Sequence, residues 1–147
     1  MKITIGIVLF LVVVTASWAN WGDPLPPGLI GLLQSQSDKS VCRCEYYKSP
    51  NYGQLVLTRN CDLNDPKRAL MKIDGKFVEL SQVKTNNEPA CNKGTPFKEV
   101  WSSPGIIVIL EGTITGLGEE SCWAKGKLIV EKGQKKQIMH VEGACGI

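Results

Sequence analysis

The chain has 147 residues, about the length of one domain, with 21% charged residues, 43% hydrophobic residues and a formal net charge of +3. This composition excludes a disordered chain, a collagen and a polybasic nucleic-acid binder. Six cysteines follow a hydrophobic N-terminus. These two features together indicate an exported protein, and they do not by themselves indicate an activity.

The first 19 residues have the parts of a secretory signal peptide. Lys2 supplies a positive start, residues 5–14 are almost wholly apolar, and Ser17 and Ala19 are small residues where a signal peptidase reads them. The apolar run is too short for the ~30 Å hydrocarbon core of a bilayer. We expect cleavage after Ala19, no integral membrane anchor in the mature protein, and a soluble protein that is secreted or periplasmic.

An N-terminal extension, residues 20–40, is predicted to precede a single β domain, residues 41–147. Prolines at positions 24, 26 and 27 prevent regular helix up to Gly28. The apolar residues 29–34 can then form a short turn or helix.

From residue 41 the hydrophobic pattern has a period of two, which is typical of β-strands. Asp74-Gly75 is a strong hairpin signal because both central positions of a type I′ turn need positive φ. Strands are predicted over residues 41–48, 54–61, 69–73, 76–83, 98–101, 106–115, 122–131 and 136–145. The fold class is therefore all-β: a small antiparallel β-barrel or sandwich of seven to eight strands.

The six cysteines all lie after the predicted signal peptide, and an even number in an oxidising compartment favours three disulfides. Spacing alone leaves the connectivity open. The working hypothesis is the set Cys44–Cys61, Cys91–Cys122 and Cys42–Cys145.

No cofactor or metal ion is expected. The chain has no C-x-x-C pair and a single histidine, His140, so a thiolate metal site at Cys42 and Cys44 is disfavoured. Glycine-rich phosphate loops, zinc-protease helices and EF-hand loops do not occur. Lysines 132, 135 and 136 are interpreted as solubilising charges beside a hairpin, so no nucleic-acid partner is expected.

Two features favour a binding surface. The first is a turn region that contains all three tyrosines, Tyr46, Tyr47 and Tyr52, because tyrosine side chains are favoured at interfaces. The alternative for Tyr46 is a place in the core beside the cysteines.

The second feature is a set of apolar residues on strand faces that should meet solvent, namely Ile107, Ile109, Trp123 and Ile129. Such a patch needs either a cover or a partner. We expect the apolar residues 29–33 to pack across these strands, and a partner site is the alternative.

The sequence therefore predicts an exported, disulfide-stabilised binding module with a protein as its partner, such as an inhibitor or immunity-type protein that acts on another protein. A binder of carbohydrate or a cell-envelope ligand is one alternative. An unrecognised hydrolase is another, and Glu119, Glu120 and His140 are its candidate residues. Each of these three residues also has a structural explanation as a solvated side chain, so no catalytic residue is assigned.

Overall fold

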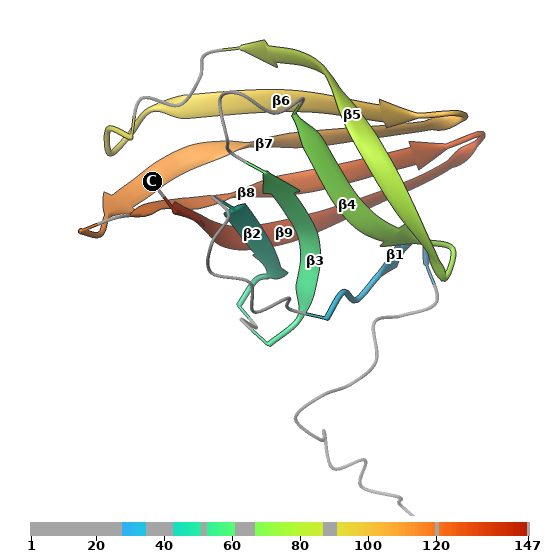
Figure 1. Cartoon of the computed structure of the whole chain (residues 1–147), viewed down its shortest axis with the longest axis horizontal. Coiled ribbons are helices and arrows are strands. Elements are labelled where there is room, and N and C mark those ends of the chain that lie inside the picture. The colour runs from blue at the N-terminus through green and yellow to red at the C-terminus, as the bar shows by residue number, and fades with distance from the viewer. Residues whose placement is uncertain are drawn as a thin grey trace, which may run out of the picture.

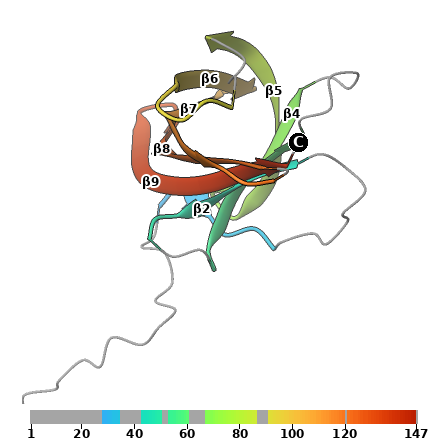
Figure 2. The ribbon, with the colours of Figure 1, turned by 90° about the vertical axis from the view of Figure 1, so that its left-hand side faces the viewer.

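The computed structural model describes residues 28–34, 43–50, 53–60, 67–86, 91–119 and 121–146. These residues form an all-β fold in which eight antiparallel strands close into a barrel (Figure 1). Figure 2 shows the ring that the strands form around a common interior. The prediction of an all-β fold is confirmed, and of the two architectures considered the protein has the barrel.

The strands follow one another around the barrel in chain order, and the first barrel strand, β2, pairs with the last, β9. Pairing of β4 with β5 completes the ring, while the short strand β1 pairs with the end of β4 at Lys72 and Ile73, next to the residues of β4 that pair with β3. The bounds are β1 Ile30–Gly31, β2 Arg43–Lys48, β3 Leu55–Asn60, β4 Arg68–Ile73, β5 Lys76–Asn86, β6 Pro96–Ser103, β7 Ile106–Leu117, β8 Ser121–Lys132 and β9 Lys135–Gly146.

Tight turns join consecutive strands at one end of the barrel. Asp74 and Gly75 have φ angles of 49° and 76°, as the predicted type I′ hairpin requires. Gly105 and Gly133 also have positive φ and lie in the turns that end β6 and β8. Glycine is favoured at these positions because it has no Cβ to clash there.

Side chains alternate between the barrel interior and the outer surface, which is the reason for the period of two in the sequence. The inward positions of β7 and β8, including Val108, Leu110 and Leu128, are fully buried. Trp101 of β6 is also fully buried in the same core. The barrel interior is therefore packed by the side chains that the alternation predicted to face inward.

The segment before β2 is extended and lies in a different place from the one predicted. Leu29, Ile30 and Leu33 are buried, and β1 pairs with β4 near the Asp74 turn. The Ile30 N–H donates to Oε1 of Gln137 at 3.0 Å, and the Asp74 N–H donates to the Leu29 carbonyl at 2.9 Å. The prediction of a turn or helix that covers the outer face of the barrel is wrong.

The physical reason for the position of residues 29–33 is the burial of their apolar side chains. Leu29 and Ile30 join the main hydrophobic core, where nearly all of their apolar surface leaves water. Strand pairing also satisfies backbone polar groups at Ile30 and Gly31. A position on the outer face would remove less apolar surface from water.

Two disulfides join the described residues, Cys44–Cys145 and Cys91–Cys122. The predicted Cys91–Cys122 bridge is confirmed. The predicted pairings of Cys44 with Cys61 and of Cys42 with Cys145 are wrong, because the β2–β9 register places Cys44 directly opposite Cys145. Cys42 and Cys61 lie outside the described residues.

The predicted signal peptide also lies outside the described residues. Within the ranges given above, no helix has the length and apolar character needed to cross a membrane. The two disulfides are compatible with an oxidising compartment.

Substitution of Ile30 by alanine should lower the free energy of unfolding by about 2–5 kcal/mol, because a large buried side chain is lost and a cavity remains. The control is Leu32→Ala at a neighbouring position that is 38% exposed, which should change stability by about 0.5 kcal/mol or less. Urea denaturation measures both. Equal effects of the two substitutions would contradict the burial of β1.

Candidate functional site

The outer surface over the β2–β9 seam has a hollow of about 420 Å³. Its lining comes from three neighbouring strands: β2, β9 and β8. The lining residues are Arg43, Glu45, Tyr47, Trp123, Gly143, Ala144 and Gly146. We call it the Tyr47–Trp123 hollow, because it brings together two aromatic residues that the sequence had singled out separately.

The floor of the Tyr47–Trp123 hollow is low because β9 carries very small side chains there. Ala144 lies directly between Glu45 of β2 and Trp123 of β8 in the strand register. A Cβ at Gly143 would collide with the Glu45 carbonyl oxygen and the Tyr46 ring. Gly143 is therefore needed for the Tyr46 ring to pack inside the barrel, while the small side chain of Ala144 leaves space on the outer side of β9.

The walls combine aromatic and charged groups. Trp123 is 45% exposed, which is a large exposure for an indole held on a strand. Opposite it, the Tyr47 hydroxyl donates to Oε2 of Glu45 at 2.5 Å. Strands lie about 4.8 Å apart, so the β2 and β8 walls stand about 10 Å apart across β9. The arrangement can receive a side chain or a small ring between an indole and a carboxylate.

A disulfide lies beneath this surface. Cys44 and Cys145 face the interior of the same two strands, β2 and β9, with their Cα atoms 3.9 Å apart. The Cys91–Cys122 bridge attaches the β5–β6 loop to β8 one residue before Trp123. A covalent link therefore joins β2 to β9 under one wall of the hollow, and a second link holds a loop to β8 beside the other wall.

A polar cluster lies inside the barrel, on the opposite side of β2 from the hollow. The Arg59 guanidinium pairs with the Glu99 carboxylate at 2.9 Å, and Trp101 Nε1 donates to the other Glu99 oxygen at 3.3 Å. Arg59 is 8% exposed and Glu99 is 2% exposed. The Arg59 Nε atom is buried and has no hydrogen-bond partner among the described residues. Arg59 also contacts Sγ of Cys145 at 3.5 Å.

Burial controls the protonation of this cluster. Loss of solvent raises the pKa of the Glu99 carboxyl, and the positive charge of Arg59 opposes that rise. Burial likewise raises the pKa of Tyr46 to about 12. The Tyr46 phenol therefore stays protonated across the physiological range and packs beside the Cys145 sulfur at 3.8 Å. The cluster is therefore explained as a buried structural ion pair, in which both Glu99 carboxylate oxygens have a partner.

Sequence reasoning missed Arg59 and Glu99, although a signal was present. Arg59 follows the inward residues Leu55 and Leu57 at a spacing of two, and Glu99 lies between the inward residues Phe97 and Trp101. Opposite charges at inward positions of two strands indicate a buried ion pair, because a lone buried charge is strongly unfavourable.

The remaining predicted binding residues lie elsewhere. Tyr46 is in the core, in agreement with the structural alternative, and Tyr52 lies outside the described residues. Ile107 and Ile109 are on the outer surface of β7, away from the residues that line the hollow. Tyr46 and Tyr47 are consecutive on β2, so their side chains point to opposite sides of the barrel wall.

The residues of the hydrolase alternative are not gathered into one site. Glu119 is exposed in the loop before β8, and Glu120 lies outside the described residues. His140 is exposed on β9, six residues before Gly146, which pairs with the start of β8. At 3.3 Å per residue, His140 lies about 20 Å along β9 from Gly146. It is therefore far from the start of β8, which Glu119 precedes. Within the described ranges, no group of three or more His, Cys, Asp or Glu residues could hold a metal ion.

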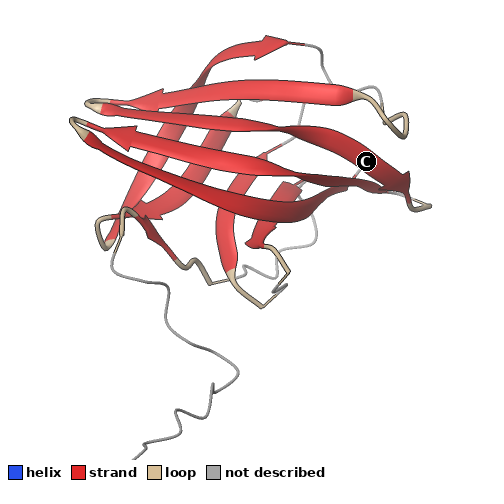
Figure 3. Cartoon of the chain, turned by 180° about the vertical axis from the view of Figure 1, so that it is seen from behind, coloured by secondary structure: helices blue, strands red, loops and turns tan. Residues whose placement is uncertain are grey.

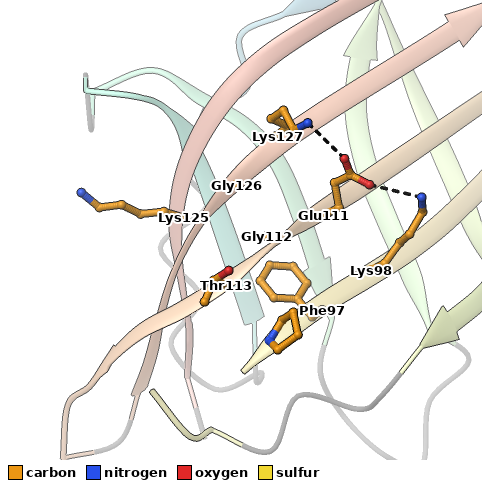
Figure 4. Close-up of a pocket in the computed structure, with 9 residues that line it drawn as sticks. Phe97, Lys98, Glu111, Gly112, Thr113, Lys125, Gly126 and Lys127 are labelled. Atoms are coloured by element: carbon orange, nitrogen blue, oxygen red, sulfur yellow. Dashed lines mark ion pairs between the residues drawn. The ribbon is translucent and has the colours of Figure 1, made fainter. Parts of the chain in front are cut away.

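A second hollow of about 550 Å³ lies over β6, β7 and β8 (Figure 4). Gly112 and Gly126 face each other at its base, and Lys98 and Lys127 stand at its side. Both lysines pair with Glu111, at 3.2 and 3.3 Å. Hydrogen bonds from these lysines lower the pKa of the Glu111 carboxyl. Because each lysine of the lining is already in an ion pair, Lys125 with Glu142 at 3.2 Å, this hollow is a weaker candidate for a charged ligand.

Comparison with known proteins gives no match: no protein-family model, no curated protein and no solved structure is significantly similar to this chain.

The buried Arg59–Glu99 pair gives a stability prediction. Glu99→Gln should cost about 3–5 kcal/mol of unfolding free energy, because it leaves the Arg59 charge buried without a counter-charge. The double substitution Arg59→Met with Glu99→Gln should cost less than Glu99→Gln alone. Urea denaturation at neutral pH measures both.

The matched control is Glu79→Gln in the exposed Arg68–Glu79 pair, whose side chains are 56% and 61% exposed. This change should cost about 1 kcal/mol or less. Similar losses for Glu99→Gln and Glu79→Gln would show that the interior pair is not desolvated as described.

Proposed function

We propose that this protein is an exported, disulfide-stabilised binding module that holds a protein partner at the Tyr47–Trp123 hollow. An inhibitor or immunity-type protein that acts on another protein is the form of this function that we favour. The observation that carries the proposal is the composition of the hollow. Arg43, Tyr47 and Trp123 represent the three residue types most enriched among interface residues that dominate binding energy, and they line one concave surface.

The position of the hollow supports the same function. Residues that dominate binding energy cluster in pockets that exclude water when the partner docks. Ala144 and the flanking glycines give the Tyr47–Trp123 hollow a floor on which a partner side chain can pack. The Cys44–Cys145 disulfide holds the β2 wall to β9 before binding, which reduces the entropy lost when a partner docks.

A carbohydrate or cell-envelope ligand is the second candidate. The specific observation in its favour is that Trp123 and Glu45 lie on the two sides of Ala144, each as its register partner on a neighbouring strand. An indole face can pack on the apolar face of a sugar ring, while a carboxylate accepts hydrogen bonds from hydroxyl groups. Retention of the native protein but not of Trp123→Ala on peptidoglycan would favour this candidate over a protein partner.

Substitution of Trp123 by alanine should weaken partner binding about 30-fold, because truncation of a central aromatic residue typically costs about 2 kcal/mol. The partner is first captured by cross-linking to the native protein in its own envelope or secreted fraction. Titration of the purified partner against native and variant protein then gives the dissociation constants.

The matched control is Phe77→Ala. Phe77 is an aromatic residue that is 67% exposed on β5, outside the hollow, and its truncation should leave binding unchanged. If Trp123→Ala and Tyr47→Ala both bind the partner as tightly as the native protein does, the proposed site is wrong.

A further inference from the structure

The Glu45 carboxylate lies in the Tyr47–Trp123 hollow without a counter-charge. Among the described residues Glu45 has no ion pair, and its carboxylate accepts a hydrogen bond from the neutral hydroxyl of Tyr47. Each of the other five acidic residues on the described strands is in an ion pair: Glu79 with Arg68, Glu99 with Arg59, Glu111 with Lys98 and Lys127, Glu131 with Lys136, and Glu142 with Lys125. The rule that this barrel follows for its strand carboxylates is therefore broken at the hollow.

Two aromatic side chains stand beside this carboxylate. Glu45 and Trp123 are the register partners of Ala144 on the two sides of β9, and Tyr47 follows Glu45 on the outer face of β2. Figure 3, which shows the molecule from behind, marks the C-terminal end of the chain, where β9 ends beside β8 and where the hollow lies. The methyl group of Ala144 is too short to fill the space between Glu45 and Trp123.

An unpaired carboxylate beside an exposed indole is suited to a cation. The face of an indole attracts a cation through its quadrupole, more strongly than the rings of tyrosine and phenylalanine do. A carboxylate adds a charge-assisted hydrogen bond, which is about twice as strong as a neutral one. An anion would be repelled by Glu45, and an apolar group would leave the carboxylate without a partner once water is excluded.

Arginine fits the hollow better than lysine does. A guanidinium is planar, stacks on aromatic rings and is more weakly hydrated than an ammonium group. Its N–H donors can reach Oε1 of Glu45, since Oε2 already accepts from Tyr47. Arg43 lines the same hollow two residues before Glu45 and repels additional positive charge. The hollow therefore suits one arginine side chain and disfavours a polybasic segment.

We propose that the protein partner inserts an arginine side chain into the Tyr47–Trp123 hollow, where the guanidinium packs on the Trp123 indole and pairs with the Glu45 carboxylate. This inference rests on the proposed function and adds the chemistry of the group that the partner supplies. The Tyr47 hydroxyl then has a role, because it orients the carboxylate before the arginine arrives.

Titration of the native protein with short capped peptides tests this chemistry. A glycine–arginine–glycine peptide is compared with the same peptide carrying citrulline, which keeps the shape of arginine but has no charge. The arginine peptide should bind about 10-fold more tightly, because citrulline forms neither the cation–π contact nor the ion pair. High salt should reduce this difference. Nuclear magnetic resonance shifts of the Trp123 indole and the Tyr47 amide measure both affinities.

Substitution of Glu45 by glutamine should abolish the preference for arginine over citrulline. The glutamine side-chain oxygen can still accept the hydrogen bond from Tyr47, so the change removes the charge and keeps the shape. The matched control is Glu79→Gln on β5, outside the hollow, which should keep the preference at about 10-fold. Thermal unfolding verifies that both variants are folded.

Two results would overturn the inference: an arginine peptide that binds native protein no better than the citrulline peptide does, or a preference that survives Glu45→Gln. The captured partner shows whether the proposed function fails as well. Weaker partner binding in Trp123→Ala with unchanged binding in Glu45→Gln would exclude the arginine and keep the hollow as the binding site. Unchanged binding in Trp123→Ala, Tyr47→Ala and Glu45→Gln would exclude both.

Discussion

Closure of the barrel by β2 and β9 is the constraint on which the rest of the structure depends. These strands lie near the two ends of the described chain, and the disulfide between them spans 101 residues. Seven of the eight strand pairs in the ring need only a turn or loop between consecutive strands, whereas this pair needs the whole chain to be in place. In the chain-entropy view, a bridge over a loop of about 100 residues stabilises the folded state by about 4–5 kcal/mol.

The same seam produces both the interior and the exterior features of interest. Tyr46 and Tyr47 are consecutive on β2, so one side chain packs in the core and the other forms a wall of the hollow. On β9, Gly143 accommodates the Tyr46 ring inside the barrel, and the next residue, Ala144, lies under the hollow on the outside. The proposed binding surface is therefore built on the same two strands as this part of the core, and separation of β2 from β9 would remove it.

Local patterns predicted much of the fold. The period of two identified all eight barrel strands and the inward faces of β7, β8 and β9, and Asp74-Gly75 identified a hairpin, because both depend on residues close in sequence. The destination of residues 29–33 could not be predicted, because a short apolar run fits any uncovered apolar surface. The Cys44–Cys145 pairing also depends on a register between distant strands. Arg59 and Glu99 were within reach, since each occupies an inward position of its strand.

Of the candidate site, the sequence indicated Tyr47 and Trp123 as separate residues, and only the order of strands around the barrel placed them at one hollow. The central claim is that side chains of β2, β9 and β8 act there as one surface. Nuclear magnetic resonance of labelled native protein, titrated with its captured partner, tests this most directly. The account predicts that the Trp123 indole and the amides of Tyr47 and Ala144 shift together with one dissociation constant. Shifts confined to β3, β4 and β5, with these three residues unchanged, would contradict it.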